Sequence, residues 1–264
     1  MGIPSSAEVI VRFAKGNLYS DPIKKEENDA IIQKVYSLFE LQEDQKKILI
    51  YFTDHSNWFL QGSLGQTFIL ELEDHRRDLE FRFPELYFDP AFKGIRYIII
   101  LSHAVFQDDP IFKIFTIAHE FQHIVQYSFH LRHFLMNRVF FFYFRLTIDD
   151  RQAFYMKQMG IPNEYDARRK AKIINSEMNS IELVDQYLNK KISESMNGEI
   201  VDYSFLKGIN TEAEYDFVKE SEILWADMKA EIVKIVVQIE GRKDRDDRGS
   251  ELFRAFDLFR LKGS

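Results

Sequence analysis

The chain has 264 residues, a formal net charge of −7, and 45% hydrophobic and 29% charged side chains. These values are typical of a globular protein with a substantial core, and they exclude an intrinsically disordered chain. The absence of cysteine excludes disulfides and cysteine metal sites, and the acidic balance disfavours a nucleic-acid-binding surface, so we expect no nucleic-acid partner.

The sequence shows no segment of the kind that directs a protein to or across a membrane. Residues 1–6 lack a basic region followed by a long apolar stretch, so we expect no secretory signal and a cytoplasmic protein. The densest aromatic run, Val139–Phe144, is far shorter than the roughly 20 apolar residues of a membrane span. We therefore expect no membrane span and interpret this run as core, or as the wall of a substrate groove.

Hydrophobic periodicity predicts an α+β fold that is mostly helical and contains a small mixed sheet. Two apolar, β-branched segments are the predicted strands, and the other periodic segments are predicted helices. In chain order we expect helices within 27–52, strands at 66–73 and 95–102, helices at 110–131, 134–158 and 163–190, and a helix at 211–240.

The predicted domain organisation has two parts. Residues 1–195 are expected to form one domain with the N-terminal helices and the sheet, and residues 196–264 a helical C-terminal extension. Residues 241–250 are charged and glycine-bounded, as in a linker, and 251–261 predict a short amphipathic helix. We expect this helix to dock on the body of the protein, and a regulatory contact through 251–261 is the alternative.

The predicted helix at 110–131 contains the sequence His-Glu-Phe-Gln-His at residues 119–123. Asp109 and Pro110 give this helix an N-cap residue followed by proline at its first position. On a helix, positions i and i+4 lie on the same face, so His119 and His123 can direct both imidazoles to one metal ion, with Glu120 beside them. The sequence therefore predicts a Zn²⁺ site.

The chemistry of such a site follows from its open coordination. A Zn²⁺ ion held by three protein groups keeps a fourth position for water and lowers the pKa of that water toward about 7. A neighbouring carboxylate can then accept a proton, and Glu120 is the predicted general base.

Glu164 is the leading candidate for the third ligand. It follows Gly160-Ile161-Pro162, a helix-breaking sequence, and therefore stands in the first turn of the next predicted helix. Ala167 and Ala171 share its face and would let the two helices approach closely. Asp149, Asp150 and Asp166 remain alternative ligands. His130 is a weaker one, because it lies about 10 Å along the helix from His123.

Together these segments resemble the gluzincin metallopeptidases, and among them the ImmA/IrrE-like group. The resemblance spans roughly residues 95–175 and rests on Tyr97–Leu101, Phe115–His123 and Glu164–Ala167. It implies a zincin-like domain in which His119, His123 and Glu164 bind zinc and Glu120 activates water. In such peptidases a strand beside the active helix pairs with the substrate backbone. Tyr97–Leu101 or Thr67–Glu71 could be that edge, and an ordinary internal strand is the alternative for either one.

One position departs from the family pattern. Related gluzincins often have aspartate four residues after the glutamate ligand, where it orients a histidine, and this chain has Arg168 there. Asp149, Asp150 and Asp166 are possible substitutes. The metzincin pattern requires glycine at 126 and histidine at 129, but the chain has Gln126 and Phe129.

Two functional hypotheses of different classes follow. The first is a zinc metalloendopeptidase that hydrolyses peptide bonds of a protein or peptide substrate. The second is a catalytically silent zincin scaffold that acts as a sensor or partner-binding regulatory protein. A zinc hydrolase acting on another substrate class is a third hypothesis, and an intact Glu120 favours the enzyme.

Overall fold

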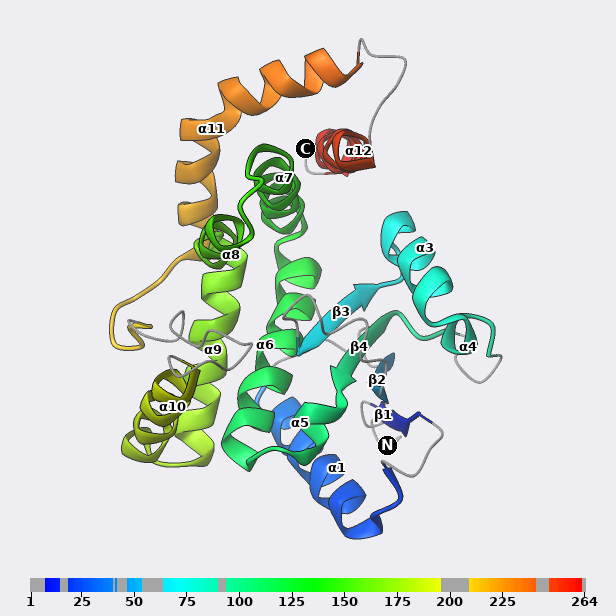
Figure 1. Ribbon diagram of the computed structural model, residues 1–264, viewed down its shortest axis with the longest axis vertical. Coiled ribbons are helices and arrows are strands. Elements are labelled where there is room, and N and C mark those ends of the chain that lie inside the picture. Colours follow the sequence, from blue (N-terminus) through cyan, green and yellow to red (C-terminus); the bar gives the residue numbers. More distant parts are fainter. Residues whose placement is uncertain are drawn as a thin grey trace, which may run out of the picture. The chain divides into compact units, whose positions relative to one another are not determined.

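The computed structural model describes residues 8–14, 19–39, 41, 47–53, 64–89, 94–195, 209–240 and 247–262. Over these residues the fold is α+β and mostly helical, as predicted, with one small mixed sheet (Figure 1). The strands of the sheet are β1 (Glu8–Phe13), β2 (Lys47–Thr53), β3 (Gly65–Ile69) and β4 (Tyr97–Ser102).

The sheet has the spatial order β1-β2-β4-β3. Strands β1, β2 and β4 are parallel, whereas β3 runs antiparallel to β4. Every residue of β4 is buried, as its continuous apolar sequence predicts, because β4 is central. The expectation that Tyr97–Leu101 could be a substrate-binding edge is therefore wrong. Among the described strands, β1 and β3 are the outer ones, so Thr67 lies in an edge strand.

Helices cover both faces of the sheet. Leu49, Ile98 and Phe68 point to one face, where they pack against Leu79, Phe83 and Leu86 of α3 (Glu73–Arg82) and α4 (Pro84–Tyr87). The opposite face receives α1 (Pro22–Ser37) and α5 (His103–Gln107), with α3 and α4 on the other side of the strands in Figure 1. Double-sided burial explains why the strands are apolar at nearly every position.

The remaining helices follow the sheet in the chain. They are α6 (Pro110–Phe129), α7 (Leu131–Thr147), α8 (Arg151–Met159), α9 (Pro162–Met178), α10 (Ile181–Ser195), α11 (Phe217–Glu240) and α12 (Asp247–Lys262). Helices α6 and α11 agree with the predicted segments at 110–131 and 211–240, apart from ends that differ by a few residues.

Two predicted helices are each divided in two. The segment 134–158 contains most of α7 and most of α8. It is divided because the Asp150 side chain accepts a hydrogen bond from Ala153 N and starts a new helix. The segment 163–190 contains most of α9 and part of α10, with Ser180 capping α10 through Leu183 N. Both errors arose because a capping residue was passed over within a periodic apolar pattern.

The N-terminal prediction was partly wrong. Residues 27–52 were expected to be helical, yet the apolar patch at 48–52 belongs to β2, which is buried between β1 and β4. A short apolar run does not separate a buried strand from a buried helix by periodicity alone. Strand β1 and helices α3, α4 and α5 were not predicted.

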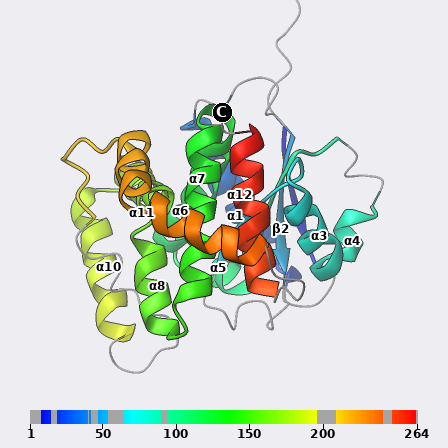
Figure 2. The ribbon, with the colours of Figure 1, turned by 90° about the horizontal axis from the view of Figure 1, so that it is seen from above.

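The C-terminal helix α12 docks on the body of the protein, as expected. It lies alongside α7 and also packs on α11 (Figure 2). Leu252, Ala255 and Phe259 are its buried side chains. The predicted linker at 241–250 was too long, because α12 already begins at Asp247, and residues 241–246 lie outside the described residues.

The described residues form two compact units. One comprises those within 1–124 and 170–203, and the other those within 125–169 and 204–264. The boundaries fall inside α6 and α9, so each of these helices contributes to both units. The division of the chain at 195 into two domains stays a prediction.

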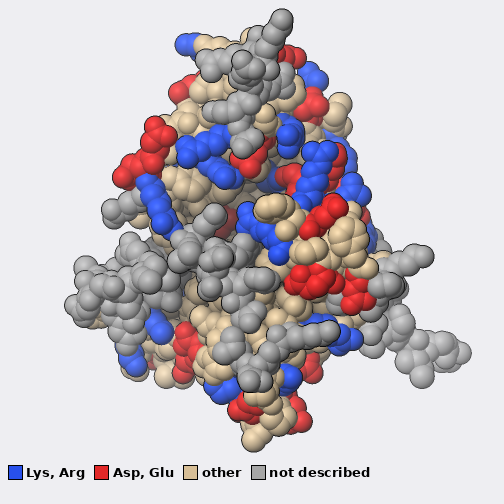
Figure 3. All heavy atoms as spheres, turned by 45° about the vertical axis from the view of Figure 1, so that its right-hand side comes forward, with Lys and Arg blue, Asp and Glu red and all other residues tan. Residues whose placement is uncertain are grey.

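No helix in the described ranges has the length and apolarity needed to cross a membrane. The aromatic run Val139–Phe144 lies in α7, where Val139, Phe140 and Tyr143 are buried in the core. On the face shown in Figure 3, lysine and arginine are interspersed with aspartate and glutamate, so that face presents charges of both signs.

The central position of β4 predicts which apolar residues support the fold. Ile99 is fully buried and pairs with Ile50 and Thr67 on the neighbouring strands. Changing Ile99 to alanine should lower the free energy of unfolding by about 2–5 kcal/mol, because it leaves a cavity in a close-packed core.

Urea denaturation followed by circular dichroism measures this loss. The control is Ile23→Ala on α1, where the side chain is 66% exposed and the change should stay within about 0.5 kcal/mol. Equal effects of the two substitutions would contradict a central β4.

Candidate metal centre

Helix α6 carries the histidine motif and begins as the sequence predicts. Asp109 Oδ1 accepts a hydrogen bond from Ile111 N at 2.8 Å, and Pro110 is the first helical residue. The helix then continues through residues 119–123, with Ala118, Phe121 and Ile124 fully buried. These apolar neighbours fix which face of α6 is turned inward.

The two histidines converge as the helical spacing predicts. His119 Nε2 and His123 Nε2 are 3.1 Å apart, and their rings are nearly perpendicular at 88°. Two nitrogens at about 2.0–2.1 Å from a tetrahedral zinc ion would be roughly 3.3 Å apart. The observed separation is therefore close to the spacing that a shared metal ion requires.

Glu164 of α9 lies close enough to complete the group. One ligand atom from each of His119, His123 and Glu164 lies within 4.8 Å of the others, and all three side chains are half-buried. This is the group that the described residues offer for a metal ion. Two imidazoles and one carboxylate are a donor set that suits zinc, and half-burial leaves the group reachable from solvent.

Glu120 is buried and held by the edge strand β3. Its side chain is 5% exposed, and its Oε2 accepts a hydrogen bond of 2.7 Å from the Thr67 hydroxyl. The Thr67 hydroxyl also lies 3.1 Å from the backbone oxygen of Glu120. A bond to a charged acceptor is stronger than one between neutral groups, so Thr67 restricts the position of this carboxylate.

A glycine in β3 makes room for the same carboxylate. A Cβ atom placed on Gly65 would lie 2.9 Å from Glu120 Oε1 and 3.1 Å from Leu101 Cδ2. The absence of a side chain at Gly65 thus allows strand and helix to approach closely. Neither Gly65 nor Thr67 was connected with Glu120 from the sequence.

A buried glutamine ties α6 to the first turn of α9. Gln126 Nε2 donates to the backbone oxygen of Asn163 at 2.9 Å and to Asp166 Oδ2 at 2.8 Å. These acceptors flank Glu164 in the sequence. Asp166, an alternative ligand in the sequence analysis, lies outside the group of candidate ligand atoms and accepts a bond from this glutamine.

Arg168 replaces the aspartate of the family pattern and turns toward α8. Its guanidinium donates to the backbone oxygen and sulfur of Met159. Burial lowers the pKa of Arg168, whereas the negative charge of Glu164, one turn earlier, raises it. Arg168 is therefore a buried cation one helical turn from the candidate ligand Glu164.

The other candidates raised from the sequence lie elsewhere. The Asp149 side chain is 98% exposed and pairs with Arg248, and Asp150 caps α8. The His130 ring packs edge-on against Phe217, and burial lowers its pKa. None of the three belongs to the group formed by His119, His123 and Glu164.

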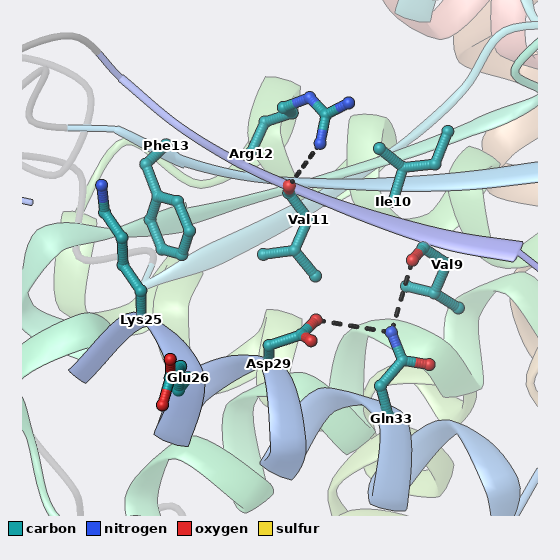
Figure 4. Close-up of a pocket in the computed structure, with 9 residues that line it drawn as sticks. All are labelled: Val9, Ile10, Val11, Arg12, Phe13, Lys25, Glu26, Asp29 and Gln33. Carbon is teal, nitrogen blue, oxygen red and sulfur yellow. Dashed lines mark hydrogen bonds between the residues drawn. The ribbon is translucent and has the colours of Figure 1, made fainter. Parts of the chain in front are cut away.

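A separate groove of about 450 Å³ lies between β1 and α1 (Figure 4). Its polar side chains already bind within the groove, since Gln33 Nε2 lies 3.4 Å from both Val9 O and Asp29 Oδ1. Its lining contains no residue of the histidine and glutamate group, so the groove is no part of the candidate metal centre.

Comparisons of the chain with protein-family models, with curated proteins and with solved structures found no match. The function of this protein is therefore inferred from the arrangement of its own residues.

Metal analysis tests the group directly. We expect one Zn²⁺ per chain, and Glu164→Ala should weaken zinc binding by about 100-fold or more, because losing even an outer partner of a ligand costs about 10–100-fold. The measurement is competition with a chromophoric chelator. Glu177→Ala, an exposed site on the same helix, is the control and should bind zinc like the parent. Full affinity in Glu164→Ala would exclude Glu164 as a ligand.

Proposed function

We propose that this protein is a zinc-dependent metallopeptidase in which His119, His123 and Glu164 bind zinc and Glu120 is the general base. The observation that supports it most strongly is the convergence of three ligand atoms within 4.8 Å, beside a buried glutamate that is adjacent in sequence to one of the histidines. This is the function implied by the resemblance to gluzincins, and it needs no residue beyond those found together.

The proposed role of each group follows from its chemistry. Bound zinc would supply a Lewis acid that polarises a carbonyl oxygen and makes water acidic enough to react at neutral pH. Glu120 would accept a proton from the attacking water and pass it to the departing amine. Thr67 would keep the Glu120 carboxylate in the position from which it does both, through the 2.7 Å bond to Oε2.

A peptide is the proposed substrate class because of the strand next to Glu120. Strand β3 is the outer strand on its side of the described sheet, and it carries both Gly65 and Thr67. An extended peptide can add to such an edge through main-chain hydrogen bonds, which would place its backbone near Glu120.

Glutamine at position 120 tests the proposed base. Glu120→Gln keeps the size of the side chain but cannot take a proton, so peptide cleavage should fall by at least about 100-fold while zinc binding is retained. The assay is incubation with a diverse peptide library, and mass spectrometry identifies the new termini.

Chelation followed by zinc addition should remove and restore cleavage by the parent. The silent-scaffold hypothesis predicts instead that the zinc-loaded parent produces no new termini. Equal cleavage by the parent and by Glu120→Gln would exclude Glu120 as the base.

The contacts of Glu120 with β3 predict a second set of variants. Thr67→Val removes the hydroxyl, and Gly65→Ala adds a methyl group next to Glu120 Oε1, so both should lower kcat by about tenfold, equivalent to about 1.4 kcal/mol, without loss of zinc. Thr67→Ser keeps the hydroxyl and should retain most of the activity. Gly160→Ala is the control, because its new methyl group would meet only Lys157 O at 3.4 Å and Met156 O at 3.9 Å. Unchanged kcat in Thr67→Val would show that Thr67 does not position the base.

A further inference from the structure

Four buried polar residues connect the ligand-bearing turn of α9 to three other helices. They are Gln126 of α6, Asn137 of α7, Asn163 of α9 and Ser221 of α11, each no more than 9% exposed. Buried polar groups cost free energy unless they are hydrogen-bonded. The bonds that each one makes therefore show what the group holds in place.

Asn137 caps the helix that carries Glu164. The first N–H groups of a helix lack partners within it, and the residue before Pro162 is Ile161, whose side chain cannot accept a hydrogen bond. Asn137 Oδ1 instead accepts from the backbone N–H of Asn163, at 3.3 Å. Asn163 immediately precedes Glu164, so this contact fixes the backbone next to the proposed ligand.

The same asparagine is held from two other sides. Its Nδ2 donates to the backbone oxygen of His133 at 2.7 Å and to Ser221 Oγ at 2.7 Å. Ser221 in turn donates to the backbone oxygen of Phe217 at 2.7 Å, one turn earlier in α11. Asn137 is thus satisfied at both ends of its amide and cannot turn without losing bonds.

The segment leading into α11 also binds the start of α9. The Arg169 guanidinium donates to the backbone oxygens of Asn210, Thr211 and Ala213. Tyr215 lies against Tyr165, with ring centroids 4.7 Å apart, and its hydroxyl donates to Pro162 O at 3.4 Å. Burial raises the pKa of Tyr215, with a further contribution from Asp166, so the hydroxyl keeps its proton.

We propose that Asn137 is a positioning residue for Glu164 and that Ser221 of α11 anchors it, so that zinc affinity depends on the C-terminal helical region. This inference rests on the proposed metal site and extends it to residues that touch no ligand atom. Gln126 holds the same turn from α6, so Asn137 and Gln126 fix Glu164 from two directions. A shift of the turn would move the carboxylate away from the two imidazoles.

The test compares Asn137→Ala with Asn28→Ala in the full chain. Asn28 is also fully buried, and it donates to two backbone oxygens, of Lys24 in α1 and Phe106 in α5. Both substitutions should lower the urea concentration at which half of the protein is unfolded, because each leaves buried polar groups without a hydrogen bond. Only Asn137→Ala should weaken zinc binding, by about tenfold or more, in chelator competition at a temperature where circular dichroism shows both variants to be folded.

Cobalt substitution supplies a second readout that loss of stability alone would not change. The visible absorption of bound Co²⁺ reports the number and type of its ligands, so the spectrum of Asn137→Ala should shift toward that of Glu164→Ala. The spectrum of Asn28→Ala should match the parent. Ser221→Ala should change the zinc affinity and the cobalt spectrum in the same direction as Asn137→Ala, but to a smaller extent. If Asn137→Ala does not fold, Ser221→Ala is the variant that tests the positioning role.

The outcomes separate this inference from the proposed function. A parent that binds no zinc would overturn the metal site together with this inference. A parent that binds zinc, with Asn137→Ala and Ser221→Ala matching Asn28→Ala in affinity and spectrum, would overturn the positioning role alone. The catalytic role of Glu120 is measured by cleavage and is unaffected by either result.

Discussion

The candidate site depends on one constraint, which is that a carboxylate on one helix must lie within 4.8 Å of two imidazoles on another. The helix itself brings the two imidazoles together, because residues four apart on α6 share a face. No local geometry brings Glu164 close to the imidazoles, because it is 41 residues beyond His123 in the sequence. Its position must come from tertiary contacts. The structure supplies them as directional hydrogen bonds to the residues on either side of it, from Gln126 to Asn163 and Asp166, and from Asn163 to Asn137.

Glu120, the proposed general base, is constrained in a different way, by close packing. Glu120 follows His119 directly on α6, and its carboxylate contacts β3. There Gly65 provides space and Thr67 provides a hydrogen bond. Because β3 is anchored by pairing with the buried central strand β4, the carboxylate is held by the sheet. The ligands and the base thus have separate supports, and substitutions in one support should affect metal binding or proton transfer without equally affecting the other.

The sequence predicted those features that are set by local periodicity and spacing. The α+β class, helix α6 with its cap, the face shared by His119 and His123, and the strand at 95–102 all follow from patterns within about 20 residues. The grouping of Glu164 with the histidines was predicted from a glutamate in a first helical turn, followed by alanines at i+3 and i+7. What it did not predict depends on contacts distant in the chain. The residues around Thr67 and Gly65 in the sequence do not indicate that these two contact Glu120. From the sequence alone, Asn137 is only a polar residue in an apolar helix. The divided helices were missed because Asp150 and Ser180 act as caps inside patterns that otherwise continue.

The buried polar chain from Gln126 to Ser221 is not needed for stability as such. Its members contribute little net free energy, because each bond replaces one with water, and apolar side chains of similar size could stabilise these helices as well. Apolar contacts are not directional, however, and they would let α9 slide or rotate slightly at little cost. A metal site tolerates errors of only about 0.2 Å in its ligand distances. Hydrogen bonds with fixed donors and acceptors restrict the position of a helix end far more than packing does. On this argument the polar core around Asn137 serves the precision of the proposed metal centre, and α11 belongs to that centre structurally even though it contributes no ligand.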